Sequence, residues 1–321
     1  MRVFLTGASG AIGTRLVPQL IGRGHEVIGT TTSPESAERV RALGAEAIVL
    51  DLLDPRAVRE AVRDAQPEAI VHEATALASV RFTRNLDKSF VATNRLRTEG
   101  TDALLAAARE AGVSRFVAQS FAAMRYARTG GWVKTEDDPL DPVPLDGMRD
   151  VLAALNHLER AVRGAGGIVL RYGLFYGAEN DGLVEPVRKR QFPIVGDGAG
   201  YSTFVHLEDA AAATVLALDR DGPAIFNIAD DEPAPVREWL PVLAEALGAK
   251  PPRRVPVWLA RLIAGDVAVM LATEARGVSS EKAKRELGWT LRYPTWREGF
   301  AAVYARPTAS PATPVPTLAR S

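Results

Sequence analysis

The sequence has no cysteine among its 321 residues. This absence excludes disulfide bonds, thiolate nucleophiles and thiolate-ligated metals, and we expect no metal site. Neither sign of charge is in excess, because 39 lysines and arginines balance 39 aspartates and glutamates. Such a balance lacks the basic surplus that draws a protein to nucleic acid or anionic lipid. The composition therefore favours a small, largely uncharged partner and no nucleic acid.

Long uninterrupted apolar runs are also missing. The N-terminal stretch MRVFL is too short for a signal peptide and leads directly into a glycine turn. The most hydrophobic stretch, Val255–Ala272, contains Arg261 and Asp266, which favours a buried or groove-lining helix over a membrane span. We therefore expect a cytoplasmic protein with no membrane role.

Short β-branched runs alternate with helical patterns in the first half of the chain. The expected strands are Arg2–Thr6, Glu26–Thr31, Glu46–Leu50, Ala69–His72, Arg115–Ser120 and Gly167–Arg171. Alternation of this kind requires crossover connections, which make the strands parallel and put helices on both faces. The sequence therefore predicts an α/β fold, a doubly wound parallel sheet of the Rossmann type with a smaller C-terminal substrate lobe.

The pattern changes after about Leu174, where glycine- and proline-rich loops lead to helices expected near Val236–Leu247 and Val255–Ala272. We assign residues 1–173 to the dinucleotide-binding domain, to which residues 202–228 return through the loop and helix of Thr203–Leu218. Residues 174–201 and 229–304 would form the substrate lobe. The tail from 305 to 321 is proline-rich without apolar periodicity, and we expect it to be disordered.

The turn after the first expected strand reads TGASGAIG, with glycines at 7, 10 and 13. Gly7 permits the sharp turn, Gly10 lets backbone amides approach a pyrophosphate, and Gly13 lets the helix pack on the strand. The helix N-terminus then faces the phosphates. Because this turn follows a strand and opens a helix, it predicts a dinucleotide site made by Gly7, Ser9, Gly10, Ala11, Ile12 and Gly13.

The end of the second expected strand indicates which dinucleotide binds. An aspartate or glutamate there accepts both ribose hydrogen bonds and selects NAD(H). The sequence at 30–33 is TTTS, so no acid repels a 2′-phosphate. Thr31, Thr32 and Ser33 could donate hydroxyl protons to that phosphate, and Arg39 could add charge, although serines here could instead cap the next helix. We therefore favour NADP(H) over NAD(H).

Several further motifs occur in the order typical of one family: Asp51–Leu52, HEATA at 72–76, RFVAQS at 115–120, LRYGLFYG at 170–177 and STFVHLEDAA at 202–211. Over residues 1 to about 300, the sequence resembles the extended short-chain dehydrogenase/reductase family, which includes nucleotide-sugar epimerases and dehydratases. The resemblance implies that Asp51 and Leu52 flank the adenine. It also implies a dinucleotide channel lined by Ala74, Thr75 and Ala76, and a nicotinamide near Tyr172, Gly173 and Leu174.

Members that work by the usual mechanism carry a tyrosine, a lysine four residues later, and a hydroxyl residue near the end of the fifth strand. None of the six tyrosines here has lysine four positions on. The resemblance places Val151 and Leu155 at the two positions, on one helical face with Glu159. It places Phe121 at the hydroxyl position, so Ser120 is the catalytic candidate that is left.

Hydride addition to a ketone creates alkoxide charge that must be stabilised or protonated. Possible protein donors, each of which could equally be structural, are Ser120, Tyr172, Tyr176, Tyr201 and His206. Alternatively, a phenol beside the ketone supplies the proton intramolecularly, and an apolar pocket suffices. The residues expected around the substrate are Phe121, Met148, Val151, Leu155, Tyr176, Tyr201 and His206.

The chain is similar to atypical reductases of this family that lack the tyrosine and act in actinomycete natural-product pathways. That resemblance implies an NADPH-dependent ketoreductase of antibiotic biosynthesis, acting on an apolar, aromatic polyketide ketone with substrate-assisted protonation. A non-catalytic NADP(H)-binding regulator is the main alternative. A nucleotide-sugar epimerase or dehydratase is less favoured, because those reactions need the tyrosine. We expect a monomer or a homodimer.

Overall fold

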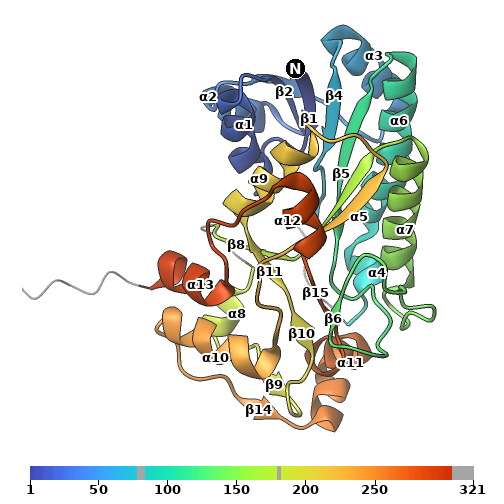
Figure 1. Cartoon of the computed structure of the whole chain (residues 1–321). Helices are drawn as coiled ribbons and strands as arrows, with labels where there is room; N and C mark the ends of the chain where they lie inside the picture. The colour runs from blue at the N-terminus through green and yellow to red at the C-terminus, as the bar shows by residue number, and fades with distance from the viewer. Residues whose placement is uncertain (78–83, 179–181, 306–321) are drawn as a thin grey trace, which may run out of the picture.

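The structure, a computed structural model, describes residues 1–77, 84–178 and 182–305. Its centre is a seven-stranded parallel sheet in the order β12–β7–β5–β4–β1–β2–β3 (Figure 1). The strands are β1 (Arg2–Thr6), β2 (Glu26–Thr31), β3 (Glu46–Val49), β4 (Ala69–His72), β5 (Arg115–Phe121), β7 (Ile168–Tyr172) and β12 (Ala224–Ile228). Helices cover both faces, so the predicted doubly wound fold is confirmed.

The helices divide between the two faces of the sheet. One face carries α1 (Gly13–Gly22), α2 (Pro34–Ala42) and α9 (Leu207–Ala217), and α9 packs on α1. The other face carries α3 (Pro55–Ala65), α6 (Thr101–Glu110) and α7 (Arg149–Gly164), which stand side by side in Figure 1. Between α4 (Leu86–Ser89) and α6 the chain forms α5 (Val91–Arg95) and a π-helical turn at Leu96–Gly100.

The predicted strands agree with the observed ones to within a residue. β1, β2 and β4 match at both ends. β3 ends at Val49, one residue before the predicted end, although the Leu50 amide still donates to Thr31 O. β5 continues to Phe121, and β7 begins and ends one residue later than predicted. β12 has no counterpart among the predicted strands.

The rest of the chain forms small parallel or antiparallel pairs. These are β8 (Leu174–Tyr176) with β11 (Phe204–His206), β9 (Ile194–Val195) with β14 (Arg254–Val255), β10 (Tyr201–Ser202) with β13 (Ala234–Pro235), and β6 (Val133–Lys134) with β15 (Gly277–Val278). An apolar cluster around Trp239 and Phe300 packs α8 (Val184–Arg188), α10 (Val236–Ala246) and α13 (Trp296–Tyr304) together. The helix α12 (Glu281–Leu287) returns to the sheet against β12 and α9.

The helix α11 (Val257–Thr273) begins two residues after its predicted start, because Pro256 occupies the N-cap. It is broken at Gly265, whose φ of 84° and ψ of 176° lie outside the helical region. α10 ends at Ala246, one residue before its predicted end. In the described part of the chain, no helix combines the length and the hydrophobicity that crossing a bilayer requires. The predicted disordered tail lies outside the described residues from 306 onward.

Candidate active site

The glycine turn lies between β1 and α1, at the carboxyl edge of the sheet. Gly7 has a φ of 74°, and a Cβ there would stand 2.8 Å from the carbonyl carbon of Glu73. A Cβ on Gly13 would stand 2.3 Å from Gly7 O. Gly10 is exposed, as is Ala11, whereas Ile12 is buried as the N-cap of α1. The turn thus presents open backbone at the start of a helix, which fits a dinucleotide pyrophosphate.

A second polar group gathers where β2 meets α2. The hydroxyl oxygen of Ser33 accepts a bond from the Ser36 amide at 3.2 Å, so Ser33 is the N-cap of α2. Arg39 donates from Nη2 to Ser36 Oγ at 2.8 Å. Thr31 is buried, whereas Thr32 is exposed. A helix N-terminus, two serine hydroxyls and a guanidinium are groups that bind phosphate.

The same turn holds one carboxylate, Glu35, in the first turn of α2. Hydrogen bonds from its own backbone amide and from the Ser33 hydroxyl lower its pKa. The charge of Arg39 acts in the same direction. Arg39 therefore offsets the charge of Glu35 at this end of α2, where its guanidinium also donates to Ser36.

The residues expected along the dinucleotide channel lie at the carboxyl ends of β3 and β4. Asp51 is exposed, and its Oδ1 accepts a bond from the Leu53 amide at 2.9 Å. Leu52 is buried beneath Gly100 of the π-helical turn. Ala74, Thr75 and Ala76 are half-buried, on the edge that also carries Gly7.

A buried acid lies directly beneath this edge. Glu73 is 3% exposed, and Tyr172 at the end of β7 donates to its Oε1 at 3.0 Å. The other carboxyl oxygen, Oε2, has no hydrogen-bond partner among the described residues. Burial raises the pKa of Glu73 to about 8, so the side chain is mainly neutral at pH 7. Tyr172 also contacts Thr214 of α9 at 2.6 Å, which fixes its ring inside the core.

Val151 and Leu155, which the resemblance places at the positions of the tyrosine and lysine, lie in one apolar cluster. They are 1% and 0% exposed. The cluster also contains Leu86, Phe90, Met148, Leu152, Val267, Met270 and Ala275, with Phe121, Met124, Leu145 and Leu271 packed against it. The structure thus brings Phe121, Met148, Val151 and Leu155 together. Two charged side chains border this cluster, because Asp87 accepts a bond from the Val151 amide and the Arg97 guanidinium lies over the Phe90 ring.

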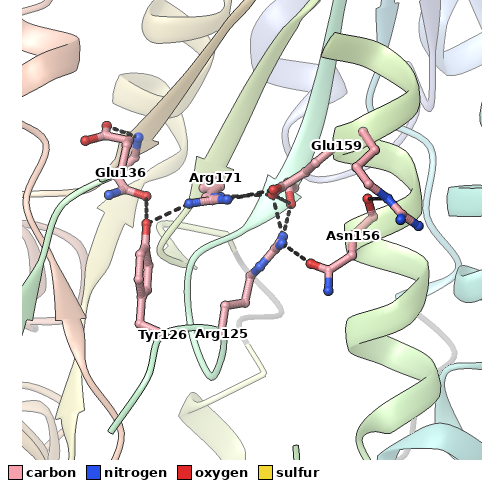
Figure 2. A network of polar contacts seen from close by, with 9 residues as sticks. Arg125, Tyr126, Glu136, Asn156, Glu159 and Arg171 are labelled. Carbon is pink, nitrogen blue, oxygen red and sulfur yellow. Dashed lines mark hydrogen bonds and ion pairs between the residues drawn. The ribbon is translucent and has the colours of Figure 1, made fainter. Parts of the chain in front are cut away.

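Ser120 belongs to a different group of side chains, on the side of the sheet that faces α7. Its hydroxyl donates to Glu159 Oε1 at 2.7 Å. Arg171 binds the same carboxylate twice, at 2.9 Å and 2.7 Å, and Arg125 binds it from a third direction. Figure 2 shows Arg171 between Tyr126 and Glu159, with Arg125 also reaching Asn156. The hydroxyl proton of Ser120 is therefore committed to a buried ion network.

The charges around this network keep the Glu159 carboxylate ionised. Burial opposes ionisation of Glu159, but hydrogen bonds from Arg171 and the charges of Arg125 and Arg171 hold its pKa below the ordinary value. Burial lowers the pKa of Arg125 to about 10, which still leaves it charged at pH 7. One carboxylate between two guanidiniums is a structural arrangement that holds β5, β7 and α7 together.

Of the three remaining candidates, Tyr176 and His206 contact each other on the paired strands β8 and β11, with ring centroids 5.1 Å apart, whereas Tyr201 lies on β10. Tyr176 is 1% exposed, its hydroxyl has no partner in the described part of the chain, and a Cβ on Gly299 of α13 would lie 1.9 Å from that hydroxyl. His206 is the N-cap of α9, and its Nδ1 accepts from the Glu208 amide at 3.1 Å. Burial lowers the pKa of His206 to about 4. Tyr201 is half-buried and stacks on Trp132. Tyr176 and His206 are not members of the apolar cluster, whereas Tyr201 borders it, because its amide donates to the backbone oxygen of the cluster residue Ala275 at 2.9 Å.

Sequence reasoning missed Glu73, Met124 and the α11 residues Val267 and Met270. Glu73 had a visible signal, because an acid directly after a buried strand is unusual. The apolar stretch that forms α11 was expected to be a buried or groove-lining helix, and its pattern could have led to Val267 and Met270. Met124 had no sequence signal.

Two kinds of comparison place the chain among known proteins. Residues 3–229 match the NAD dependent epimerase/dehydratase family. A 3-diazoavenalumate denitrifying reductase from a Streptomyces species is 40% identical over 312 residues, which covers 94% of this chain and 99% of the relative. A 4-hydroxy-2-methyl-3-oxo-4-farnesyl-3,4-dihydroquinoline-1-oxide ketoreductase from Stigmatella aurantiaca is 29% identical, covering 94% and 96%.

Among solved structures, the UDP-glucose 4-epimerase of Thermus thermophilus in complex with NAD is 26% identical, with a TM-score of 0.71 and coverage of 95% and 98%. The UDP-glucose 4-epimerase of Thermotoga maritima with UDP-glucose has a TM-score of 0.75 at 21% identity, with coverage of 95% and 97%. The second likeness concerns the fold alone.

Proposed function

The chain belongs to the NAD dependent epimerase/dehydratase family, and from this premise we propose that it is an NADPH-dependent ketoreductase. Its substrate is an apolar, aromatic ketone of the polyketide type, an intermediate of antibiotic biosynthesis whose own phenol supplies the proton. The observation that carries the proposal is the burial of Val151 and Leu155 in an apolar cluster, at the positions where the resemblance puts the reactive pair.

The cofactor of this proposal is NADPH, which supplies a hydride when bound. The open backbone of Gly7, Gly10 and Gly13 would hold the pyrophosphate. Ser33, with Ser36 and Arg39, would hold the 2′-phosphate, because these groups already lie around one helix N-terminus. We assign residues 1–173 and 202–228 to this cofactor domain and residues 174–201 and 229–304 to the substrate lobe.

The protein's own contribution is orientation and exclusion of water. A flat ring fits against apolar side chains such as Phe121. Ser120 cannot easily donate, because its proton is engaged by Glu159. When hydride adds to the carbonyl carbon, the neighbouring phenol transfers its proton to the carbonyl oxygen, which yields an alcohol and a phenolate. The phenolate regains a proton from water.

The test is NADPH oxidation with a fused phenolic ketone and with its O-methyl ether. We expect turnover of the free phenol and a loss of at least about a hundredfold with the ether, because general-acid catalysis contributes typically 10²–10⁴-fold. Binding of the ether, measured by calorimetry, is the control that separates lost chemistry from lost affinity. Equal turnover of both compounds would contradict substrate-assisted protonation.

The double substitution Val151→Tyr with Leu155→Lys tests the same point from the protein side. We expect it to abolish ketone reduction, because it places a phenol and an ammonium inside an apolar wall. Circular dichroism checks that the variant is folded. A large increase in turnover would instead contradict substrate-assisted protonation, because it would show that the missing protein acid limits the reaction.

A second candidate reaction is the reduction of an aromatic diazo compound. The relative at 40% identity carries that chemistry in its name. In this reaction hydride replaces a diazonium group, which leaves as N₂, so no proton is consumed. Nitrogen release that matches NADPH oxidation, with a diazotised hydroxycinnamate as probe, would favour this candidate over the ketone.

A non-catalytic NADP(H)-binding regulator is the competing class of function. It predicts tight NADPH binding without NADPH oxidation on either probe. Turnover of either the ketone or the diazo compound would exclude it, and a nucleotide-sugar reaction would require activity on a UDP- or dTDP-hexose.

A further inference from the structure

The methionines of this chain are distributed unevenly. The sequence contains four, of which Met1 is the first residue. The other three, Met124, Met148 and Met270, all belong to or pack against the apolar cluster around Val151 and Leu155. The cluster therefore collects every methionine beyond the first residue.

Each of these methionines comes from a different part of the fold. Met124 follows β5, Met148 is the N-cap residue of α7, and Met270 lies in the second half of α11. Met124 has a φ of 56°, in the left-handed region that is uncommon for residues other than glycine. Such backbone conformations concentrate at ligand-binding and catalytic sites.

Methionine suits a surface that must adapt its shape. Its unbranched thioether side chain has three rotatable bonds, fills irregular gaps, and makes favourable contacts with aromatic rings. A core selected for rigidity would use leucine or isoleucine at these positions instead. Three methionines from three elements therefore form a wall that can fit differently shaped aromatic ligands.

The half of α11 that precedes the break at Gly265 is held close to the start of α7 by the segment from Arg84 to Asp87. Arg84 donates from Nε to Ile263 O at 2.7 Å and from Nη2 to Leu262 O at 2.5 Å, just before the break at Gly265. Three residues later, Asp87 accepts a bond from the Val151 amide at 3.0 Å. The segment from Arg84 to Asp87 thus connects the broken helix to the position of the missing tyrosine.

We propose that Met124, Met148 and Met270 line an adaptable pocket for a flat aromatic ligand, and that Val267 and Met270 on α11 limit its size. This inference deepens the proposed function, on which its choice of ligand rests. Val267 and Met270 are 4% and 5% exposed, so the pocket opens by rotation of methionine side chains rather than from a preformed void. Neither residue belongs to the cofactor site.

Isotopic labelling of the methionine methyl groups with ¹³C tests the proposal directly. The spectrum holds four signals, which single Met→Leu substitutions at 124, 148 and 270 assign. The probe is emodin, a three-ring phenolic ketone, added in the presence of NADPH. We expect the three internal signals to shift and the Met1 signal, far from the cluster in sequence and packed elsewhere, to stay.

A matched pair of variants tests the size limit. Val267 faces this cluster, whereas Val269, equally 4% exposed on the same half-helix, packs in a separate cluster with Val195 and Ala260. We expect Val267→Ala to raise the affinity for emodin relative to the two-ring 1-hydroxy-2-acetonaphthone by about fivefold, since small changes in pocket volume discriminate by that order. Val269→Ala should leave the ratio unchanged.

The outcomes separate this inference from the proposed function. Shifts of the three signals without NADPH oxidation would support the pocket and refute the reductase. NADPH oxidation with unshifted methionine signals would support the reductase and overturn the pocket. If neither aromatic probe binds at saturating concentration, or if Val269→Ala changes the affinity ratio as much as Val267→Ala, the inference is wrong.

Discussion

In the proposed NADPH site, Arg39 is the side chain that would distinguish the two nicotinamide cofactors. It is the only cation that contacts the serines at the start of α2 among the described residues. We expect Arg39→Ala to weaken NADPH binding about tenfold, because hydrogen bonds to charged groups contribute about 1.5–3 kcal/mol. NADH binding should stay constant, since its ribose carries no phosphate there.

Fluorescence titration with both cofactors measures this effect. Arg41→Ala is the control, because Arg41 lies on the same helix and pairs with Glu38 instead. A loss of affinity for NADH as large as that for NADPH would show that Arg39 acts on the helix and not on the phosphate.

Glu73 makes the stability of the protein depend on pH. Its folded pKa of about 8 lies above the ordinary value of 4.5, so the folded chain keeps a proton that the unfolded chain releases. Stability therefore falls as pH rises from 4.5 to about 8 and levels off above it. Asp230, with a pKa also raised by burial to about 8, contributes in the same direction.

The histidines act in the opposite direction but in another window. Burial lowers the pKa of His72 and His206 to about 4. Their contribution to stability therefore rises with pH between 4 and 6.5 and stays constant above pH 6.5. We expect the Tm of the wild type to fall between about pH 6.5 and pH 8.5. The Tm of the Glu73→Gln variant should fall less steeply over this pH range, and calorimetry at several pH values measures both slopes. An identical slope in the variant would show that Glu73 is ionised in the folded protein.

At the scale of elements, the sheet was the part that sequence reasoning could predict. Runs such as RVFLT and EVIGTT have the β-branched, apolar composition of buried parallel strands, and glycine marks the turn after the first. The end of β3 was misplaced by one residue because Leu50 continues the apolar run although the ladder stops at Val49. The break in α11 was missed because one glycine within an apolar helix has no distinctive pattern.

The candidate site likewise contains a part that the sequence could predict and a part that only the fold brings together. The glycine turn could be predicted from its spacing together with its place between a strand and a helix, since its physics is local. The Glu159 network could not, because Arg125 and Arg171 reach it from distant parts of the chain and only tertiary packing brings them together. Val267 and Met270 likewise reach Val151 only through the fold.

Gly265 determines the shape of α11. Its φ of 84° and ψ of 176° are accessible almost only to glycine, and a Cβ would stand 3.4 Å from the Arg84 Cβ. We expect Gly265→Ala to destabilise the protein by about 1–3 kcal/mol through backbone strain. Urea unfolding measures the change.

Gly22 provides the matched control for this substitution. It ends α1, its φ is not positive, and a Cβ added there would meet no described atom within 4 Å. Gly22→Ala should stabilise by about 0.4–1 kcal/mol, because alanine restricts the unfolded chain. If Gly265→Ala were equally harmless, the break would not be a fixed feature of α11.

At the scale of the whole molecule, Asp209 joins the C-terminal segment to the sheet. Its two carboxylate oxygens accept bonds from the Arg292 and Tyr293 amides at 2.7 Å and 3.0 Å, and its backbone oxygen accepts from Trp289 Nε1. Asp209 lies in α9, which packs on α1 beside the glycine turn. The last part of the chain is thus anchored to the cofactor side of the molecule.

This anchor predicts that both parts of the molecule unfold together. All five tryptophans occur at position 132 or later, so their fluorescence reports mainly on the segments outside the first four strands. Far-ultraviolet circular dichroism reports on every helix. In the wild type we expect the fluorescence and circular dichroism transitions to have the same midpoint temperature. NADPH should raise both midpoints equally, because a ligand that binds one part of a cooperatively unfolding protein stabilises all of it.

Asp209→Ala should separate the two transitions. The variant leaves two backbone amides without their acceptor, at about 1–3 kcal/mol each, and we expect the fluorescence transition to fall by roughly 5 °C or more. Asp219→Ala is the control, because Asp219 pairs with Arg23 on the surface, where ion pairs contribute little. If Asp209→Ala lowers both midpoint temperatures equally, apolar contacts hold the C-terminal segment in place. Asp209 would then add stability but would not be needed for the two parts to unfold together.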